Sequence, residues 1–336
     1  MPRQRPEPNV PLVTRTPRTA VVAVGGNALL DGGASATIAE QFEHAQRFAT
    51  QLRQVVGTGW RIVLTHGNGP QVGFIKRRSD LVSELEPGLP QLGLDMCVAD
   101  SQGSIGYILA ASIQSELRAS GLSEQVVALI THTVVREDDP AFSLPTKPIG
   151  SFYDQETAQR LAEENGWTIV EDSGRGWRRL VASPRPQRIV EQDAISALVD
   201  AGFLVVAAGG GGIPVIEQSD GRYQGVEAVI DKDFASALLA AELDADLLCI
   251  TTGVERIAIN FGTPNQRELD TLGLDEARAH LADGQFPPGS MGPKVQAALS
   301  FVEETGGEVL ITHPDRLADA MAGQAGTRFV ATAPIA

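Results

Sequence analysis

The sequence predicts a doubly wound α/β sandwich with an inserted subdomain, and three observations support that organisation. From Thr19 onward, short β-branched runs alternate with longer amphipathic segments. Several of the short runs end in glycine-rich turns, and residues 133–186 depart from the alternation. Repeated strand–helix–strand units form a mainly parallel sheet that helices cover on both faces. We therefore expect one large α/β domain over residues 19–336, with a small protruding subdomain inserted at about 133–186.

The first strand–helix–strand unit lies at the start of this pattern. AVVAV (20–24) is a continuous apolar run, which is typical of a fully buried strand. RIVLT (61–65) is a second run of the same kind. Between them a helix is predicted, because apolar residues recur there at steps of three and four: Ile38, Phe42, Ala45, Phe48, Leu52 and Val55.

The later elements follow the same rules. Further strands are predicted at 126–131, 203–208, 246–252 and 308–312. Helices are predicted at 104–119, 191–201, 233–243, 293–304 and 315–322. Between Thr133 and Pro186, turns rich in proline and glycine separate one short helix, QETAQRLAEENG, from short strands, and this segment is the expected inserted subdomain.

Composition excludes some classes of partner. The chain has 27 basic and 42 acidic residues and a formal net charge of -15, which disfavours nucleic acid or an acidic membrane as a partner. No apolar run approaches the ~20 residues that span a bilayer. Residues 1–18 contain five prolines and four arginines but no apolar core of a signal peptide, so we expect a disordered N-terminal extension.

The cysteines and histidines indicate a reducing compartment and no metal centre. Cys97 and Cys249 lie far apart, each in an apolar or strand-like segment, which is typical of buried free thiols in the cytoplasm. The five histidines show no metal-ligand spacing with one another or with the cysteines.

Three glycine-rich turns each follow a predicted strand: VGGN (24–27), THGNGP (65–70) and AAGGGGIP (207–214). In an open parallel sheet such turns lie at the carboxyl ends of the strands, where glycine lets backbone N–H groups approach an anion. One such turn alone is more often only a tight connection, but three indicate a shared anion site. Neither G-x-G-x-x-G nor G-x-x-x-x-G-K-[ST] is present, which disfavours a dinucleotide oxidoreductase and a P-loop enzyme.

A phosphate site without a P-loop lysine needs positive charge from elsewhere. Lys232 and Lys294 stand beside aspartate, glycine or proline turns in a chain whose basic residues are mostly arginine. The ordinary alternative for each is a solvated surface lysine.

Ten ordered segments resemble the motif series of the carbamate kinases, within the amino acid kinase superfamily. They are AVGGNAL, LTHGNGPQVG, SQGSIGY, DDPAF, PTKPIG, EDSGRGWRR, SPRP, AAGGGGIPV, GVEAVIDKDFAS and GSMGPK, and the likeness runs from about Thr19 to Val330. The resemblance implies an open αβα sandwich, a cytoplasmic homodimer, and reversible phosphoryl transfer between ATP, with Mg²⁺, and carbamate to give ADP and carbamoyl phosphate.

The matching motif positions also imply residue roles. Gly25, Gly26 and Asn27 would contact the transferring phosphoryl group, and Lys232 and Lys294 would neutralise it. Asp233 would hold both lysines in place. The remaining positions would surround carbamate (Gly67, Asn68, Gly209, Gly210 and Gly211) or border the nucleotide (Gly289, Ser290 and Met291).

These roles fit the chemistry of phosphoryl transfer, which relies on positioning and on stabilising charge. Carbamate brings its own anionic oxygen and needs no general base, so we favour a structural or orienting role for His66. An aspartate between two ammonium groups favours their charged forms, although Asp233 is also a candidate helix cap. The basic cluster around Trp177 is most simply solvated or ion-paired, and the sharper hypothesis is a lid over the acceptor.

Some positions depart from the family pattern and leave the acceptor open. Glu137 stands where many members carry a lysine beside the acceptor, and Ser151 and Ala182 replace common prolines. One alternative is a kinase of the same fold that acts on another small carboxylate. Another is a catalytically silent nucleotide or metabolite sensor, which the joint presence of Asn27, Lys232, Asp233 and Lys294 disfavours.

Overall fold

The computed structural model describes residues 17–25, 37–86, 88–172, 174–287 and 289–330. Residues 1–16 of the expected N-terminal extension lie outside these ranges, and so do Gly26 and Asn27 of the first glycine turn. Arg18 already belongs to the first strand, one residue before the expected start of the domain.

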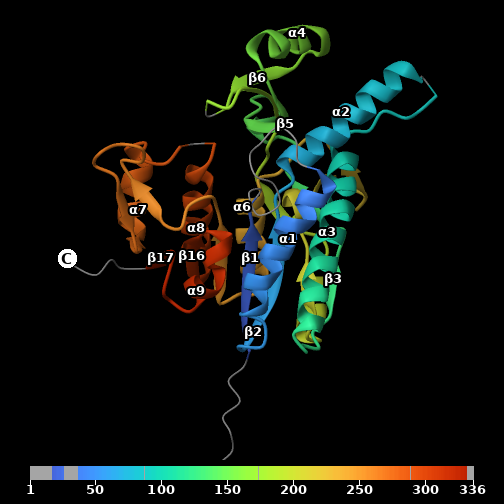
Figure 1. Cartoon of the computed structure of the whole chain (residues 1–336). Helices are drawn as coiled ribbons and strands as arrows, with labels where there is room; N and C mark the ends of the chain where they lie inside the picture. Colours follow the sequence, from blue (N-terminus) through green and yellow to red (C-terminus); the bar gives the residue numbers. More distant parts are fainter. Residues whose placement is uncertain (1–16, 26–36, 87, 173, 288, 331–336) are drawn as a thin grey trace, which may run out of the picture.

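An eight-stranded sheet forms the centre of the molecule, in the order β15-β17-β16-β12-β1-β2-β9-β3 (Figure 1). The strands are β1 (Arg18–Val24), β2 (Trp60–His66), β3 (Val126–Ala128), β9 (Leu204–Val206), β12 (Leu247–Thr251), β15 (Thr271–Gly273), β16 (Glu308–Thr312) and β17 (Thr327–Val330). Neighbouring strands pair in parallel except β16 and β17, which are antiparallel. The mainly parallel sheet is thereby confirmed.

Helices cover both faces of this sheet, because the side chains of a strand alternate between the faces. Val21 and Ala23 of β1 pack in one apolar cluster with α5 (Gln192–Asp200), α6 (Lys232–Glu242) and α8 (Met291–Thr305). Val22 and Val24 pack on the opposite side with α1 (Ile38–Arg53), α3 (Leu94–Ala119) and α9 (Leu317–Met321). Residues 20–24 are wholly buried, which explains their continuous apolar run.

Several elements differ from the sequence prediction. Helix α2 (Gly69–Leu85) was not predicted, because its buried face consists mostly of polar residues and glycine. Helix α3 begins ten residues before the predicted 104, and β3 covers only the first half of the predicted 126–131.

A second sheet was also missed. It has the order β11-β10-β4-β8 and comprises β4 (His132–Val135), β8 (Pro186–Ile189), β10 (Ile213–Glu217) and β11 (Tyr223–Gly225). Its strands are short and come from distant parts of the chain.

A smaller unit lies above the main body in Figure 1. It consists of the antiparallel strands β5 (Lys147–Tyr153), β7 (Trp177–Val181) and β6 (Thr168–Glu171) with α4 (Gln155–Asn165). Its β5 backbone rests on α2, because a Cβ atom on Gly73 would lie 2.1 Å from the Cα of Gly150. The segment expected as one subdomain therefore contains this unit together with β4 and β8 of the second sheet.

The remaining elements lie at the periphery. They are the hairpin β13 (Ile257–Ile259) and β14 (Arg267–Leu269), α7 (Leu274–Ala282), and the 3₁₀ turns η2 (Pro140–Phe142), η3 (Gly209–Gly211) and η4 (Pro314–Arg316). Cys97 and Cys249 are buried free thiols, as expected, and burial raises the pKa of each to about 12. In the described part of the chain, no helix has the length and apolar character needed to cross a membrane.

Candidate active site

The three glycine turns lie together at the carboxyl ends of three neighbouring strands of the central sheet. Gly25 follows β1, Gly67 and Asn68 follow β2, and η3 follows β9 after two residues. These three strands are adjacent and parallel, so their carboxyl ends lie side by side. The amide of Gly67 donates to the carbonyl of Val24 at 3.1 Å, which joins the ends of β1 and β2 directly.

Close packing explains why glycine is needed in two of these turns. A Cβ atom on Gly25 would lie 2.6 Å from the carbonyl oxygen of Thr251, and the Gly25 amide donates to Thr251 Oγ1 at 2.9 Å. At Gly210, where φ is +66°, a Cβ atom would lie 2.1 Å from Nδ2 of Asn68. The Asn68 side chain thus fills space that only glycine leaves, and its Nδ2 donates to Ser101 Oγ at 2.8 Å.

Buried polar residues that the sequence analysis missed hold the η3 turn. Gln102 Nε2 donates to the carbonyls of Gly209 at 3.0 Å and Thr131 at 3.1 Å, while its Oε1 accepts from the Thr131 amide at 2.9 Å. Thr131 Oγ1 accepts from the Ala208 amide at 2.6 Å. A glutamine within an otherwise apolar helix face, in SQGSIGY, is the signal that could have identified this support.

His66 packs beneath the same turn. Its side chain is buried, and a Cβ atom on Gly209 would lie 2.2 Å from its Nε2. Burial lowers the pKa of His66 to about 4, and nearby Lys232 acts in the same direction. The imidazole is therefore neutral near pH 7, which supports a structural role over acid–base catalysis.

Lys232 and Lys294 share one carboxylate. Lys232 Nζ lies 2.5 Å from Asp233 Oδ1, and Lys294 Nζ lies 3.0 Å from Asp233 Oδ2. Lys232 and Asp233 begin α6, whereas Lys294 lies in the first turn of α8 and also donates to the Ser290 carbonyl at 3.3 Å. Only 9% of Lys232 and only 14% of the Lys294 side chain is exposed, so neither is the solvated surface lysine of the alternative interpretation.

These three groups set one another's pKa values. Burial acts to raise the pKa of Asp233, but the two ammonium groups and their hydrogen bonds outweigh it and hold that pKa well below its usual range. Burial lowers the pKa of Lys232, against the attraction of Asp233. For Lys294 burial also acts to lower the pKa, but the attraction of Asp233 and Asp231 raises it overall. Asp233 is therefore ionised, and Lys294 protonated, at neutral pH.

The cap of α6 is Asp231, not Asp233. A cap precedes the first helical residue, which is Lys232. The Asp231 side chain accepts from the Asp233 amide at 2.9 Å. Asp231 also accepts from Lys147 Nζ at 2.5 Å, which brings PTKPIG to the site. Glu137, by contrast, is exposed. The lysine that reaches Asp231 is Lys147 of β5.

Helix α6 connects the lysine cluster to the glycine turns at the carboxyl ends of β1, β2 and β9. It packs against β1, β2 and η3, and Ser236 Oγ lies 2.6 Å from Thr65 Oγ1 in β2. A cavity opens beside the cluster, and its lining includes Lys147, Arg178, Asp231, Phe286, Gly289 and Ser290. Met291 begins α8 and packs against the core behind it.

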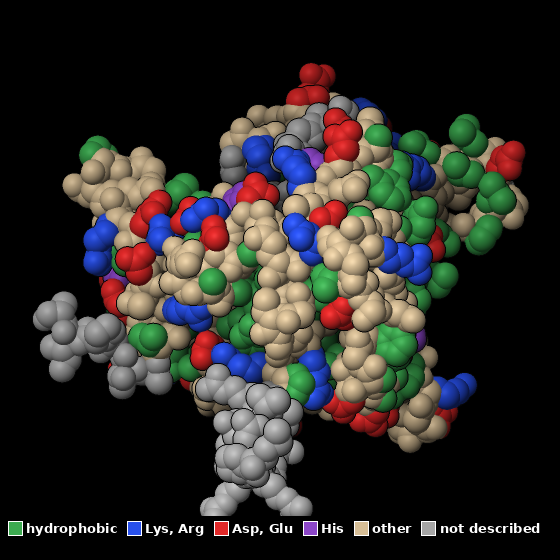
Figure 2. Space-filling view, turned by 60° about the horizontal axis from the view of Figure 1, so that its bottom comes forward, with side chains coloured by type: hydrophobic (Ala, Val, Ile, Leu, Met, Phe, Trp, Pro, Cys, Tyr) green, Lys and Arg blue, Asp and Glu red, His purple; other side chains and the backbone are tan. Residues whose placement is uncertain are grey.

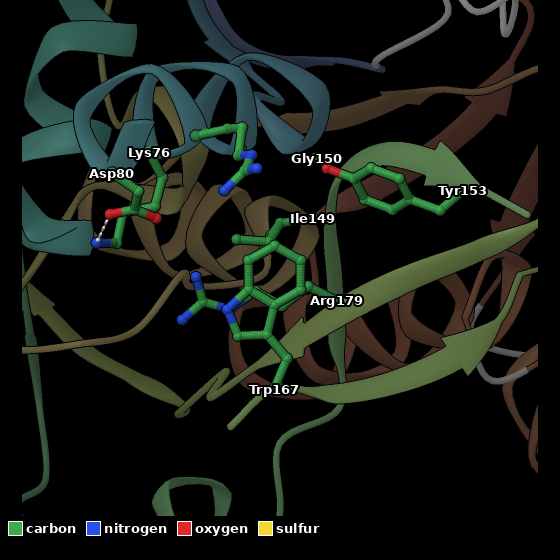
Figure 3. A pocket seen from close by; sticks show the side chains of 9 residues that line it. Lys76, Asp80, Ile149, Gly150, Tyr153, Trp167 and Arg179 are labelled. Carbon is green, nitrogen blue, oxygen red and sulfur yellow. Dashed lines mark hydrogen bonds and ion pairs between the residues drawn. The ribbon is translucent and has the colours of Figure 1, made fainter. Parts of the chain in front are cut away.

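The basic cluster around Trp177 is divided between two sides of β7. Arg178 lines the cavity beside Asp231, whereas Arg179 lines a separate pocket between α2 and β5 (Figure 3). In that pocket the guanidinium carbon of Arg179 lies 5.1 Å from the centre of the Trp167 ring, and Lys76 pairs with Asp80 at 2.6 Å. Successive residues of a strand point to opposite faces, which explains the separation.

The two carboxylates at the start of α6, Asp231 and Asp233, form ion pairs with lysines. Within the described residues, no group of three or more His, Cys, Asp or Glu side chains is arranged to hold a metal ion. Asp231 pairs with Lys147, and Asp233 pairs with Lys232 and Lys294.

Comparisons with known proteins agree on one group. The profile of the amino acid kinase family matches residues 18–313. "Carbamate kinase-like protein YahI" of Escherichia coli is 47% identical over 313 residues, covering 93% of this chain and 98% of the relative. "Carbamate kinase 3" of Staphylococcus aureus is 50% identical over 308 residues, covering 91% of this chain and 97% of the relative. The structure of carbamate kinase from Giardia lamblia bound to citric acid superposes with a TM-score of 0.88 at 40% identity, covering 93% of this chain and 98% of that chain.

Proposed function

Since the chain belongs to the amino acid kinase family, and within it to the carbamate kinases, we propose how its residues carry out reversible phosphoryl transfer between ATP and carbamate. Lys232 and Lys294 neutralise the transferring phosphoryl group, and Asp233 holds the two ammonium groups in place. The observation that carries this proposal is the shared carboxylate, with contacts of 2.5 Å and 3.0 Å to the two lysines.

The chemistry asks for positioning and charge rather than covalent participation. In phosphoryl transfer the protein aligns the attacking and leaving oxygens and stabilises charge on the equatorial oxygens. Asp233 is ionised and bonded to both lysines, so it orients them and is unsuited to accept a proton. Carbamate supplies its own anionic oxygen, and neutral His66 supports the turn beneath it.

The glycine turns supply the other contacts. Gly25, together with Gly26 and Asn27, contacts the phosphoryl group, the latter two by their place in the motif alone. Gly67, Asn68 and the Gly209–Gly211 turn (Gly209, Gly210, Gly211) surround carbamate. Gly289, Ser290 and Met291 border the nucleotide, and the cavity beside Ser290 supports that assignment.

Magnesium enters this proposal with the nucleotide. Asp231 and Asp233 are bonded to lysines, so these two carboxylates do not form a protein cage for a cation. Mg²⁺ commonly keeps several waters and binds substrate phosphates, and it would neutralise phosphate charge there. The residues present therefore suit MgATP or MgADP as the substrate.

The inserted subdomain, expected at about 133–186 within the kinase domain 19–336, has the β5-β7-β6 sheet and α4 as its core in this proposal. It closes over the acceptor and excludes water. Support comes from Lys147, which β5 carries to Asp231 at the site.

Assembly and location complete the proposal. We propose a homodimer, supported by exposed apolar side chains on α2 and α3, among them Val82, Leu85, Met96 and Tyr107. Hydrophobic side chains gather on the right-hand side of Figure 2, the side on which α2 and α3 lie in Figure 1. The two buried free thiols support a cytoplasmic location.

One assay tests the activity directly. Purified protein is incubated with ADP, magnesium and carbamoyl phosphate, and ATP formation is followed, with samples lacking ADP or carbamoyl phosphate as controls. We expect ATP only in the complete mixture. Binding of ADP without any ATP formation would instead support a silent nucleotide sensor.

A further inference from the structure

Arg178 is a buried arginine, and two of its three guanidinium nitrogens have no hydrogen-bond partner among the described residues. Only 8% of the residue is exposed. Nη1 donates to Asp172 Oδ2 at 3.1 Å, whereas Nε and Nη2 are buried and have no hydrogen-bond partner among the residues that the structure describes. Buried polar groups almost always have a partner, so these two donors call for one.

The two unused donors lie on the same edge of the guanidinium group. Nε–H and Nη2–H point in parallel directions and together match the two oxygens of a carboxylate. Arg136 uses this same edge in the present chain, where Nε lies 2.8 Å from Asp138 Oδ1 and Nη2 lies 2.6 Å from Asp138 Oδ2. Arg178 presents the edge without the carboxylate.

Nη2 of this edge lies near the turn that the proposed function assigns to the acceptor. Nη2 of Arg178 lies 3.9 Å from the position that a Cβ atom on Gly69 would occupy. Gly69 begins α2 directly after Asn68, and the start of a helix favours negative charge. Arg178 also lines the cavity that contains Lys147 and Ser290.

The side chain is held in this direction before any ligand binds. Asp172 bonds one end of the guanidinium, and the Phe152 ring lies 4.9 Å from its central carbon. Such support means that little side-chain entropy remains to be lost on binding.

We propose that Arg178 binds both carboxyl oxygens of the acceptor through Nε and Nη2, which makes it a catalytic residue contributed by the inserted subdomain. The inference rests on the proposed function of the site. In the ATP-forming direction the bond between phosphorus and the carbamoyl oxygen breaks, and its electron pair remains on that oxygen. The phosphoryl group forms a bond to a β-phosphate oxygen of ADP, while Arg178 stabilises the negative charge that develops on the departing carbamate.

Replacement by lysine provides the sharpest test. Arg178→Lys keeps the positive charge but cannot hold two oxygens in parallel. Because a hydrogen bond to a charged group contributes about 1.5–3 kcal/mol, we expect the KM for carbamoyl phosphate to rise about tenfold to a hundredfold. The KM for ADP should stay near the wild-type value.

The matched control is Arg179→Lys, the next residue of the same strand, which faces the other pocket. This variant should keep wild-type values of both KM constants. Arg178→Ala is the second variant, and added guanidinium chloride at millimolar concentration should restore part of its rate, which a merely structural role would not allow.

The outcomes separate this inference from the function itself. No ATP from the wild-type protein would refute the proposed function. An active wild type with an unchanged carbamoyl phosphate KM in Arg178→Lys would overturn the role of Arg178. So would an equal rise of both KM values accompanied by a lower melting temperature and no guanidinium rescue.

Discussion

Lys294 Nζ lies 3.0 Å from Oδ2 of Asp233, and this contact joins the first turns of α6 and α8. The two residues are separated by 61 positions in the sequence. Their contact brings the first turns of two helices from distant parts of the chain into one charged cluster.

Removal of either lysine should abolish most of the activity. Lys232→Ala and Lys294→Ala should each lower kcat for ATP formation by about a hundredfold or more, because each removes a preorganised contact to the transition state. Initial rates with saturating ADP and carbamoyl phosphate provide the measurement. Lys76→Ala, whose lysine pairs with Asp80 away from the site, is the control and should keep its rate. A near-normal kcat in either site variant would refute its assigned role.

Asp233→Asn should affect stability as well as activity. It leaves two ammonium groups close together, and loss of one partner from a buried ion pair costs about 3–5 kcal/mol. Urea unfolding should show this loss in the free energy of unfolding. Asp138→Asn, at an exposed pair with Arg136, is the comparison and should leave the free energy of unfolding nearly unchanged, because solvent screens exposed ion pairs. Equal stability of the two variants would contradict the importance of the cluster.

Stability should decline between pH 6.5 and pH 4 because of His66. The pKa of His66 is about 4 in the folded chain against an unperturbed 6.5, so in this interval the unfolded chain binds a proton that the folded chain does not. The contribution is complete above pH 6.5 and is lost as the pH falls toward 4, by about 3 kcal/mol in all. Urea unfolding of His66→Asn should show a weaker pH dependence in this range than wild type, whereas His44→Asn on α1 should retain it.

Gly73→Ala should disturb the contact between α2 and the inserted subdomain. The new Cβ atom would lie 2.1 Å from Gly150 Cα and 2.3 Å from Gly150 N, so backbone must move, at a cost of about 1–3 kcal/mol. We expect a lower melting temperature and a higher KM for carbamoyl phosphate. Gly103→Ala on α3 is the matched control, because a Cβ atom there meets nothing within 4 Å. It should stabilise the helix by about 0.5–1 kcal/mol.

Removal of the subdomain tests whether it acts as a lid. Lys147 and Val181 pair across β5 and β7, so a Gly-Gly turn can replace residues 148–180 and leave both strand ends in place. This design spares β4 and β8, which a deletion of 133–186 would take from the second sheet. The shortened protein should show a higher KM for carbamoyl phosphate or faster hydrolysis of ATP by water. Unchanged kinetics would remove the lid hypothesis.

Strands and helices with a strong apolar pattern could be predicted from the sequence. β1 is buried on both faces and is therefore a continuous apolar run, whereas α1 is buried on one face and its apolar residues recur at steps of three and four. α2 lacked that signal, since its buried residues include Gln71, Gly73 and Asp80. The four-stranded sheet could not be predicted either, because β4 pairs with β10 about 80 residues away and both strands are short.

The sequence by itself determined the alternation of elements, the glycine turns and their motifs, because local periodicity and backbone freedom are properties of short segments. Only the tertiary structure decided which charged side chains from distant parts of the chain lie in contact. It placed Lys232 and Lys294 on one carboxylate, assigned the helix cap to Asp231, and directed Arg178 and Arg179 to opposite sides of one strand. Such contacts depend on how helices and sheets pack over long separations, and no short stretch of sequence contains that information.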